Sequence, residues 1–187
     1  MKKGFTLLEL LIVIGILAIL AAVVVVVLNP AQLLAQARDS QRVSDLASLN
    51  SALNLYMSDV TPLSYGVDTT CYASAAISLA TCQARHSTKT LPAGGVTNVA
   101  RVVNGTGWMP VDFTGISSGS PLPTLPADPT NDTASLFYSY STKTASSTFE
   151  LNAVFESTKY KPMMLNSKDG GNKDNVYETG TQPGLDI

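Results

Sequence analysis

The sequence predicts an α+β protein in which one long N-terminal helix packs on a small antiparallel β-sheet. Three patterns lead to this prediction. Residues 5–28 form an apolar run, and residues 43–57 carry an apolar stripe at helical spacing. Residues 148–156 alternate between apolar and polar side chains, which is typical of a strand with one buried face. The first half of the helix is therefore expected to span a membrane, and the second half to be amphipathic.

The apolar run is long enough to cross a bilayer. At about 1.5 Å rise per residue, a helix over residues 5–28 spans a hydrocarbon core roughly 30 Å thick. The residues that interrupt the run are Thr6, Glu9 and Gly15. Lys2 and Lys3 precede it, and the next basic residue is Arg38. This asymmetry places the N-terminus in the cytoplasm and the rest of the chain outside.

Glu9 is costly in this setting, by a few kcal/mol if it is ionised at the bilayer centre. A partner charge would explain it. A cut between Gly4 and Phe5 would create an α-amino group about one helical turn from Glu9. The amine of one subunit could then neutralise the carboxylate of its neighbour. The short basic leader, residues 1–4, fits such a cut.

Residues 3–9 read KGFTLLE and are followed by LLIVI. This stretch resembles the class III signal of type IV pilins and type II secretion pseudopilins, and the resemblance covers about the first third of the chain closely. It implies that a prepilin peptidase cleaves after Gly4 and that the new N-terminal Phe5 is methylated. It also implies that Glu9 guides each subunit into a growing filament, and that the fold is pilin-like.

The resemblance implies several partners: further copies of the chain, prepilin peptidase, an inner-membrane assembly platform and minor pilins. The chain would cross the cytoplasmic membrane once before assembly, and would form an extracellular or envelope-spanning filament afterwards. A pilus subunit is favoured over a secretion pseudopilin, because a polar second half with two cysteines suits a variable exposed surface. The net charge of −2, with 14% charged residues, gives no basic field for nucleic acid.

Two simpler readings of the N-terminus compete with this one. In a secretory signal peptide, a cut after Ala21 or Ala22 would leave residues 23–28 as an apolar new terminus. In a plain single-pass anchor, Glu9 would have no role. Both readings are less favoured.

After the apolar run, Asn29 is expected to act as a local cap and Pro30 to occupy the first turn of a continuing helix. The apolar stripe of this second part consists of Val43, Leu46, Leu49 or Asn50, Leu53 and Tyr56. Asp39 and Arg42 are spaced for a pair on the helix surface. The small and charged segment around them is equally compatible with packing against neighbouring subunits and with a solvated face.

The chain length of 187 residues leaves room for one globular domain after the helix. The predicted parts are a leader at 1–4, a membrane or filament-core helix at 5–28, its amphipathic continuation at 29–58, and a head domain at 59–187. Within the head, the predicted elements are a short helix at 73–80, strands at 96–103 and 108–116 joined by a turn at 104–107, and an exposed proline-rich loop at 117–132.

The clearest hairpin joins residues 136–141 to residues 148–156 through a loop at 142–147. Apolar side chains at alternate positions of the second strand are expected to face the core, with the intervening polar ones outside. The proline-rich loop followed by this hairpin also resembles, more loosely, the C-terminal part of small pilins and of the major pseudopilin.

Cys71 and Cys82 lie in the part of the chain expected outside the cytoplasm, so a disulfide between them is the expected state. The alternative is a pair of buried thiols. Their spacing fits no standard zinc pattern, and His86 is expected to be a solvated loop residue rather than a metal ligand.

The tail at residues 166–175 is rich in oxygen-bearing side chains and contains two adjacent glycines. It is similar to the calcium loop of major pseudopilins. The candidate ligands are Asp169, Asn172, Asp174 and Asn175. A plain turn is the favoured alternative, because the segment supplies few carboxylates. No cofactor is expected to be required.

No catalytic set of nucleophile, base and orienting residue is evident, because the single histidine, His86, falls in a polar stretch. The chain is therefore not expected to be an enzyme. A different class of function remains open, namely a membrane-tethered module that binds glycans through exposed aromatic side chains. Tyr65, Tyr72 and Trp108 are its candidates, and the competing interpretation is that they cover the core.

Overall fold

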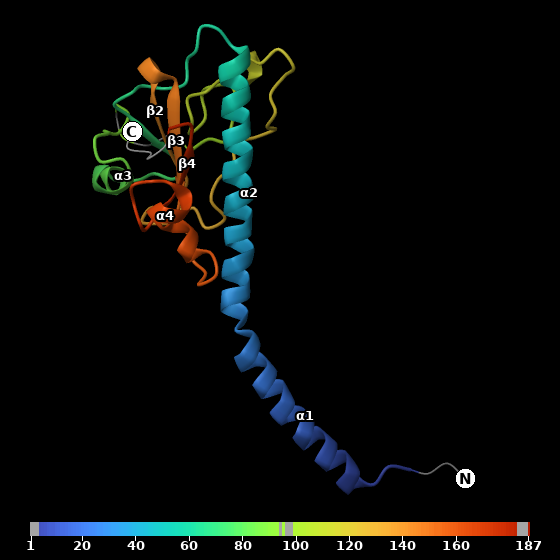
Figure 1. The fold of residues 1–187 in the computed structure, drawn as a ribbon. Helices are drawn as coiled ribbons and strands as arrows, with labels where there is room; N and C mark the ends of the chain where they lie inside the picture. Colours follow the sequence, from blue (N-terminus) through green and yellow to red (C-terminus); the bar gives the residue numbers. More distant parts are fainter. Residues whose placement is uncertain (1–3, 94, 96–98, 183–186) are drawn as a thin grey trace.

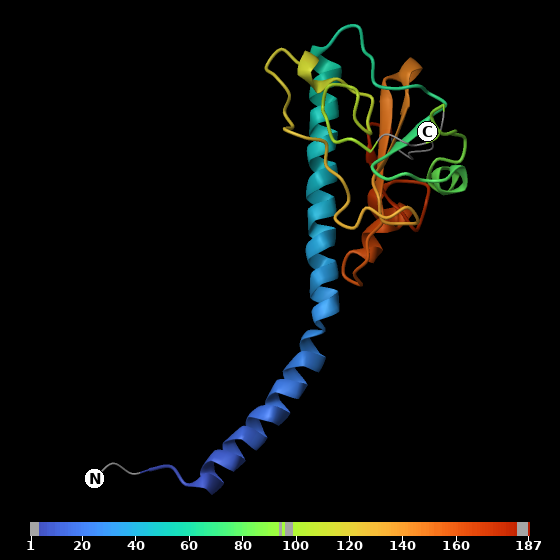
Figure 2. The ribbon, with the colours of Figure 1, turned by 180° about the vertical axis from the view of Figure 1, so that it is seen from behind.

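The computed structural model describes residues 4–93, 95, 99–182 and 187. It contains a long bent rod and a head that packs along the second half of that rod (Figure 1). The rod consists of α1 (Leu7–Leu28) and α2 (Pro30–Asp59). In both views α1 extends away from the head, and no other element lies beside it (Figure 2).

The bend of the rod lies at Asn29, which adopts the left-handed conformation with φ 40° and ψ 76°. Asparagine is one of the few residues other than glycine that tolerate this region. The Asn29 side chain accepts a hydrogen bond from the backbone N–H of Gln32 at 3.4 Å, and Pro30 occupies the first turn of α2. The predicted cap and proline position are therefore both present.

The apolar stripe of α2 faces the head. Leu46, Leu49, Leu53 and Tyr56 are all at most 2% exposed and belong to the main core. Burying one leucine contributes roughly 1.5–3 kcal/mol before the entropy cost of ordering the chain. The predicted stripe thus docks the head on α2.

The sheet has four antiparallel strands in the order of the sequence. They are β1 (Cys71–Ala73), β2 (Ser139–Lys143), β3 (Thr148–Ala153) and β4 (Tyr177–Gly180). The pairing of β2 with β3 confirms the predicted hairpin, but β2 begins at Ser139 and not at residue 136. The reason is that Asp132 Oδ1 accepts backbone N–H groups from Ala134, Ser135 and Leu136, which holds this part of the chain in a turn.

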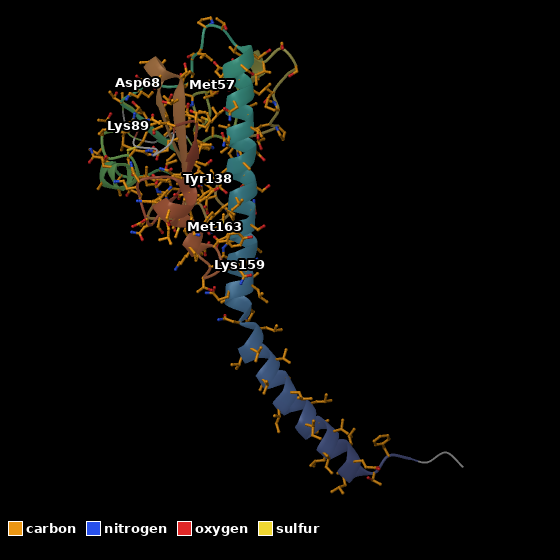
Figure 3. The ribbon with its side chains drawn as sticks, viewed as in Figure 1. Met57, Asp68, Lys89, Tyr138, Lys159 and Met163 are labelled. Atoms are coloured by element: carbon orange, nitrogen blue, oxygen red, sulfur yellow. A yellow bond between two sulfur atoms is a disulfide. The ribbon has the colours of Figure 1, made fainter. Side chains whose placement is uncertain are left out.

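Both faces of the sheet are buried, whereas one exposed face was predicted. Phe149 and Leu151 of β3 pack towards α2, while Glu150 and Asn152 point the other way and are at most 1% exposed. The segment that contains α3 (Leu79–Arg85) covers this second face. Tyr138 therefore lies between the sheet and α2, and Lys89 lies on the opposite side (Figure 3).

The two strands predicted at residues 96–103 and 108–116 were wrong where the structure describes them. Residues 96–98 lie outside the described residues. The rest forms an isolated bridge between Asn104 and Asp112 and the short 3-10 helix η1 (Phe113–Gly115). The apolar side chains of residues 108–116 still enter the core, whereas Val99 and Val102 are exposed. The backbone bonds are isolated ones between loops: the N–H of Trp108 donates to the carbonyl of Ala100 at 2.8 Å.

The predicted helix at residues 73–80 is displaced along the chain. Cys71–Ala73 forms β1, and α3 begins at Leu79 because the Ser78 side chain caps it by accepting the Thr81 N–H at 3.2 Å. The remaining short elements are η2 (Thr144–Ser146), η3 (Lys161–Met164) and α4 (Asn166–Asp169). The proline-rich segment at 117–132 contains no strand or helix, as predicted.

Candidate processing and assembly site

The N-terminus of α1 is closed by Thr6 and Glu9. The Thr6 hydroxyl oxygen accepts the backbone N–H of Glu9 at 3.2 Å, and Glu9 Oε2 accepts the backbone N–H of Thr6 at 2.9 Å. The Thr6 hydroxyl also donates to the same carboxylate oxygen at 2.8 Å. These reciprocal bonds form a capping box. Thr6 was not among the predicted functional residues, although the spacing Thr-x-x-Glu is the sequence pattern of a capping box.

The bond between Gly4 and Phe5 lies just before this cap, in a segment without helical or strand structure. Phe5 is 80% exposed, and a Cβ placed on Gly4 would meet no atom within 4 Å. Both residues that flank this bond are therefore exposed in the described chain. Cleavage there would place the new amine on Phe5, the residue before Thr6. The Cα atoms of neighbouring residues are about 3.8 Å apart, and the N–H of Thr6 already donates to Glu9.

The surface of α1 is apolar and unpaired. None of its 22 residues is buried, and its side chains project on all sides without a neighbouring element (Figure 3). Within the described residues, the rod is the one helix long and apolar enough to cross a membrane. Water is a poor environment for such a surface, so α1 requires lipid or other apolar helices around it.

A buried ionic network joins α2 to the head. Arg42 donates to both oxygens of Asp128, at 2.6 and 2.8 Å, and to Asp39 Oδ1 at 2.7 Å. Glu156 Oε1 lies 2.6 Å from the same guanidinium, and both of its oxygens also accept from Arg38. The Arg42 and Asp39 side chains are completely buried. Proximity to Arg38, and then Arg42, lowers the pKa of Glu156 to about 2.

This network corrects the expected surface pair of Asp39 and Arg42. The pair exists, but it lies inside the protein, because the loop that carries Asp128 and the chain after β3 close over it. Asp39 Oδ2 accepts the backbone N–H of Ser157 at 2.7 Å. Part of the segment predicted to face either solvent or other subunits therefore binds the chain's own head. The position of Asp128 also makes the proline-rich loop less exposed than expected.

Cys71 and Cys82 form a disulfide, as expected, with 6.4 Å between their Cα atoms. Cys71 belongs to β1 and Cys82 to α3, so the bond fastens α3 to the edge of the sheet. The bond adds a covalent link to the hydrogen bonds by which His86 and Lys89 hold the same segment on the second face of the sheet.

His86 was expected in solvent, and this expectation was wrong, because the residue is 1% exposed beneath that covering segment. Its Nε2 atom lies 3.1 Å from Ser139 Oγ, and its Nδ1 atom lies 3.1 Å from Ser141 Oγ and 3.4 Å from Glu150 Oε1. A serine, a histidine and a glutamate thus meet. All are at most 1% exposed, so a substrate cannot reach Ser139 Oγ in this arrangement.

Two of the four candidate calcium ligands bond to nearby backbone groups. The four are Asp169, Asn172, Asp174 and Asn175. Asp169 accepts backbone N–H groups from Gly171 and Glu178, at 3.0 and 3.2 Å, and Asp174 accepts that of Asn166 at 3.2 Å. Among the described residues, no three acidic, histidine or cysteine side chains could hold a metal. These contacts are those of a turn. Calcium binding stays a prediction, and a fall in melting temperature on adding a chelator would test it.

The aromatic residues proposed for glycan binding do not form an exposed platform. Tyr65 is 1% exposed and Trp108 is 2% exposed, and both belong to the main core. The Trp108 indole N–H donates to the carbonyl of Pro126 at 2.9 Å. Tyr72 is partly buried against the same core. The interpretation that they cover the core is therefore the correct one.

Comparison with known proteins adds one finding at the N-terminus. Residues 1–25 match the profile of the prokaryotic N-terminal methylation motif. No curated protein and no solved structure gave a significant match. The matched region contains Gly4, Phe5, the capping box and most of α1. Together with the α+β fold and its long apolar helix, this match shows that the chain carries the N-terminal signal of type IV pilins and type II secretion pseudopilins.

Proposed function

We propose that this chain is a structural subunit of a type IV pilus, or of a related filament, assembled after a prepilin peptidase cuts between Gly4 and Phe5. One observation carries the proposal: α1 presents 22 exposed residues, nearly all apolar and most of them within the methylation motif, and contains one carboxylate, Glu9. In the membrane, lipid covers this surface. In a filament, the α1 helices of other copies would replace the lipid, and the heads would coat the resulting bundle.

The roles of the three N-terminal residues follow from this assembly. The leader is removed at Gly4, Phe5 provides the methylated amine, and Glu9 meets the amine of a neighbouring subunit. In the single chain the Glu9 carboxylate bonds to Thr6. An amine from a neighbour would add a positive charge to a carboxylate that already has two polar donors.

A pilus subunit is favoured over a secretion pseudopilin because the head is rich in irregular loops and fastened by a disulfide, which suits a surface exposed outside the cell. The pseudopilin alternative would place the filament within the envelope. The orientation that we propose puts the N-terminus in the cytoplasm and the head outside.

Two measurements test the proposal. Mass spectrometry of the mature protein should find Phe5, carrying one methyl group, as the first residue. A first residue of Met1, or one near Val23, would contradict it. Microscopy with labelled antibody should then find filaments on the cell surface. Filaments confined to the envelope would instead assign the chain to the pseudopilins.

A further inference from the structure

A surface pocket of about 500 Å³ lies between α3 and the segment that leads into β4. Both elements lie on the side of the sheet away from α2 (Figure 1). The side chains that line the pocket and matter here are Ala80, Thr81, Ala84, Arg85, Ser135 and Asn175. Most of these side chains are small, which leaves space for a ligand. Arg85 carries a positive charge.

Arg85 is only 5% exposed. Its Nη1 atom donates to the carbonyl of Phe137 at 2.8 Å, and Nη2 donates to the carbonyl of Ser135 at 2.5 Å. A longer contact of 3.4 Å reaches Ser139 Oγ, and the guanidinium lies 3.6 Å from the centre of the Phe137 ring. These partners are neutral. Within the described part of the chain, no carboxylate lies within 4.0 Å of Arg85.

Arg42 is a second buried arginine, and its surroundings differ from those of Arg85. Three carboxylates surround that guanidinium, those of Asp39, Asp128 and Glu156. A buried charge without a counter-ion costs free energy, which a nearby anion can offset. Burial lowers the pKa of Arg85 to about 9, and the charges of Asp128 and Asp132, neither within 4.0 Å of the guanidinium, offset only part of this effect.

We propose that this pocket binds the carboxylate group of a small acidic ligand, with Arg85 as its counter-ion. A guanidinium has five N–H groups. Three have acceptors in the described chain, so two remain for a carboxylate, which arginine recognises in a bidentate manner. Thr81, Ser135 and Asn175 supply polar groups for ligand hydroxyls. The ligand is either a sugar acid or a simple carboxylate, and the proposal does not depend on filament formation.

The test uses the full chain in detergent micelles and follows binding by calorimetry with glucuronate, glucose and acetate. Glucuronate should bind saturably, and glucose, which lacks the carboxylate, should bind at least about tenfold more weakly. Acetate that binds as tightly as glucuronate would assign the site to simple carboxylates, whereas weaker acetate binding would assign it to sugar acids. Equal binding of glucuronate and glucose, or no binding of any of the three, would overturn the proposal.

A matched pair of variants on α3 locates the site. Ala84→Glu places a carboxylate in the pocket wall and should reduce glucuronate affinity at least about tenfold, by occupying Arg85 and repelling the ligand. Gln83→Glu makes the same charge change on an exposed residue of the same helix and should leave the affinity within about twofold. Equal affinities in the two variants would contradict the proposal. Because Arg85 itself holds two backbone carbonyls, its replacement also tests folding and is not used.

Discussion

The two halves of the rod, α1 and α2, have the same backbone structure and opposite surroundings. None of the 22 residues of α1 is buried, whereas α2 buries eight of its 30 residues against the head, including the charged pair of Asp39 and Arg42. Within the described residues, the chain therefore covers one face of α2 and buries no residue of α1. Stability of the head is a property of the single chain, while the fate of α1 depends on lipid or on other copies.

The largest expected effect is a loss of filament formation without a loss of head stability, which would separate the role of α1 from that of α2. Glu9→Gln keeps the shape of the side chain and removes its charge, so membrane insertion and cleavage after Gly4 should be normal. Filament formation should be almost abolished, because the attraction that aligns each subunit with its neighbour's amine is lost. Electron microscopy would count filaments in cells that express only the variant.

Two controls sharpen this prediction. The melting temperature of the head should be unchanged in Glu9→Gln, because the side-chain hydrogen bonds of Glu9 to the described residues are with Thr6, at the far end of the rod. Glu9→Val should insert at least as well and still assemble poorly. Normal numbers and lengths of Glu9→Gln filaments would show that the charge is not the docking signal.

The next largest effect concerns α2. Arg42→Ala should destabilise the head by roughly 3–5 kcal/mol, because it leaves Asp39 and Asp128 buried without a counter-charge. Arg38→Ala is the matched control, since the Arg38 side chain is 36% exposed and binds the rim of the same network. Its cost should be about 1 kcal/mol or less. Denaturant unfolding of both variants measures the difference, and equal costs would contradict the buried role of Arg42.

Reduction of the disulfide should have a somewhat smaller effect. Cys71 and Cys82 are 11 residues apart in sequence, and a loop of this length corresponds to a loss of about 3 kcal/mol in the chain-entropy picture. The double variant Cys71→Ser with Cys82→Ser should lower the melting temperature of the head and leave the cleavage after Gly4 unchanged. Mass mapping without reductant should find the two residues linked, and free thiols in fresh protein would contradict this pairing.

The smallest expected effect is a dependence on pH. The pKa of Glu156 is lowered from 4.5 to about 2 in the folded protein. A depressed carboxyl pKa stabilises the fold above the unfolded value, and this contribution is lost as pH falls from about 4.5 towards 2. Glu156→Gln should therefore be less stable than the native chain at pH 6, and the gap should narrow through this window. A gap that stays constant down to pH 2 would exclude the proposed contribution of Glu156.

The features that depend on residues close together in the sequence were predictable. The methylation motif, the apolar helix, the Asn29 cap, the stripe on α2 and the β2–β3 hairpin each follow from residue spacing within a few turns or one hairpin. A periodic pattern reports the period of the backbone directly, so these elements needed no knowledge of distant contacts.

Features governed by distant parts of the chain were not predictable from pattern. Residues 108–116 were predicted to form a strand because many of their side chains are apolar. These side chains do enter the core, but from a loop, because the backbone of this segment bonds to other loops and not to a neighbouring strand. His86 was predicted to be solvated because its neighbours in sequence are polar. The covering segment instead places it against Ser139, Ser141 and Glu150.

The sequence by itself determined that this protein carries the N-terminal methylation motif and an apolar helix, because each is encoded in contiguous residues. Only the tertiary structure decided which charges are buried and which of them are paired. Arg42 and Arg85 are indistinguishable as residues in helices, but the fold surrounds one with carboxylates and leaves the other with neutral partners. Electrostatic environment depends on groups far apart in sequence, and local spacing does not report it.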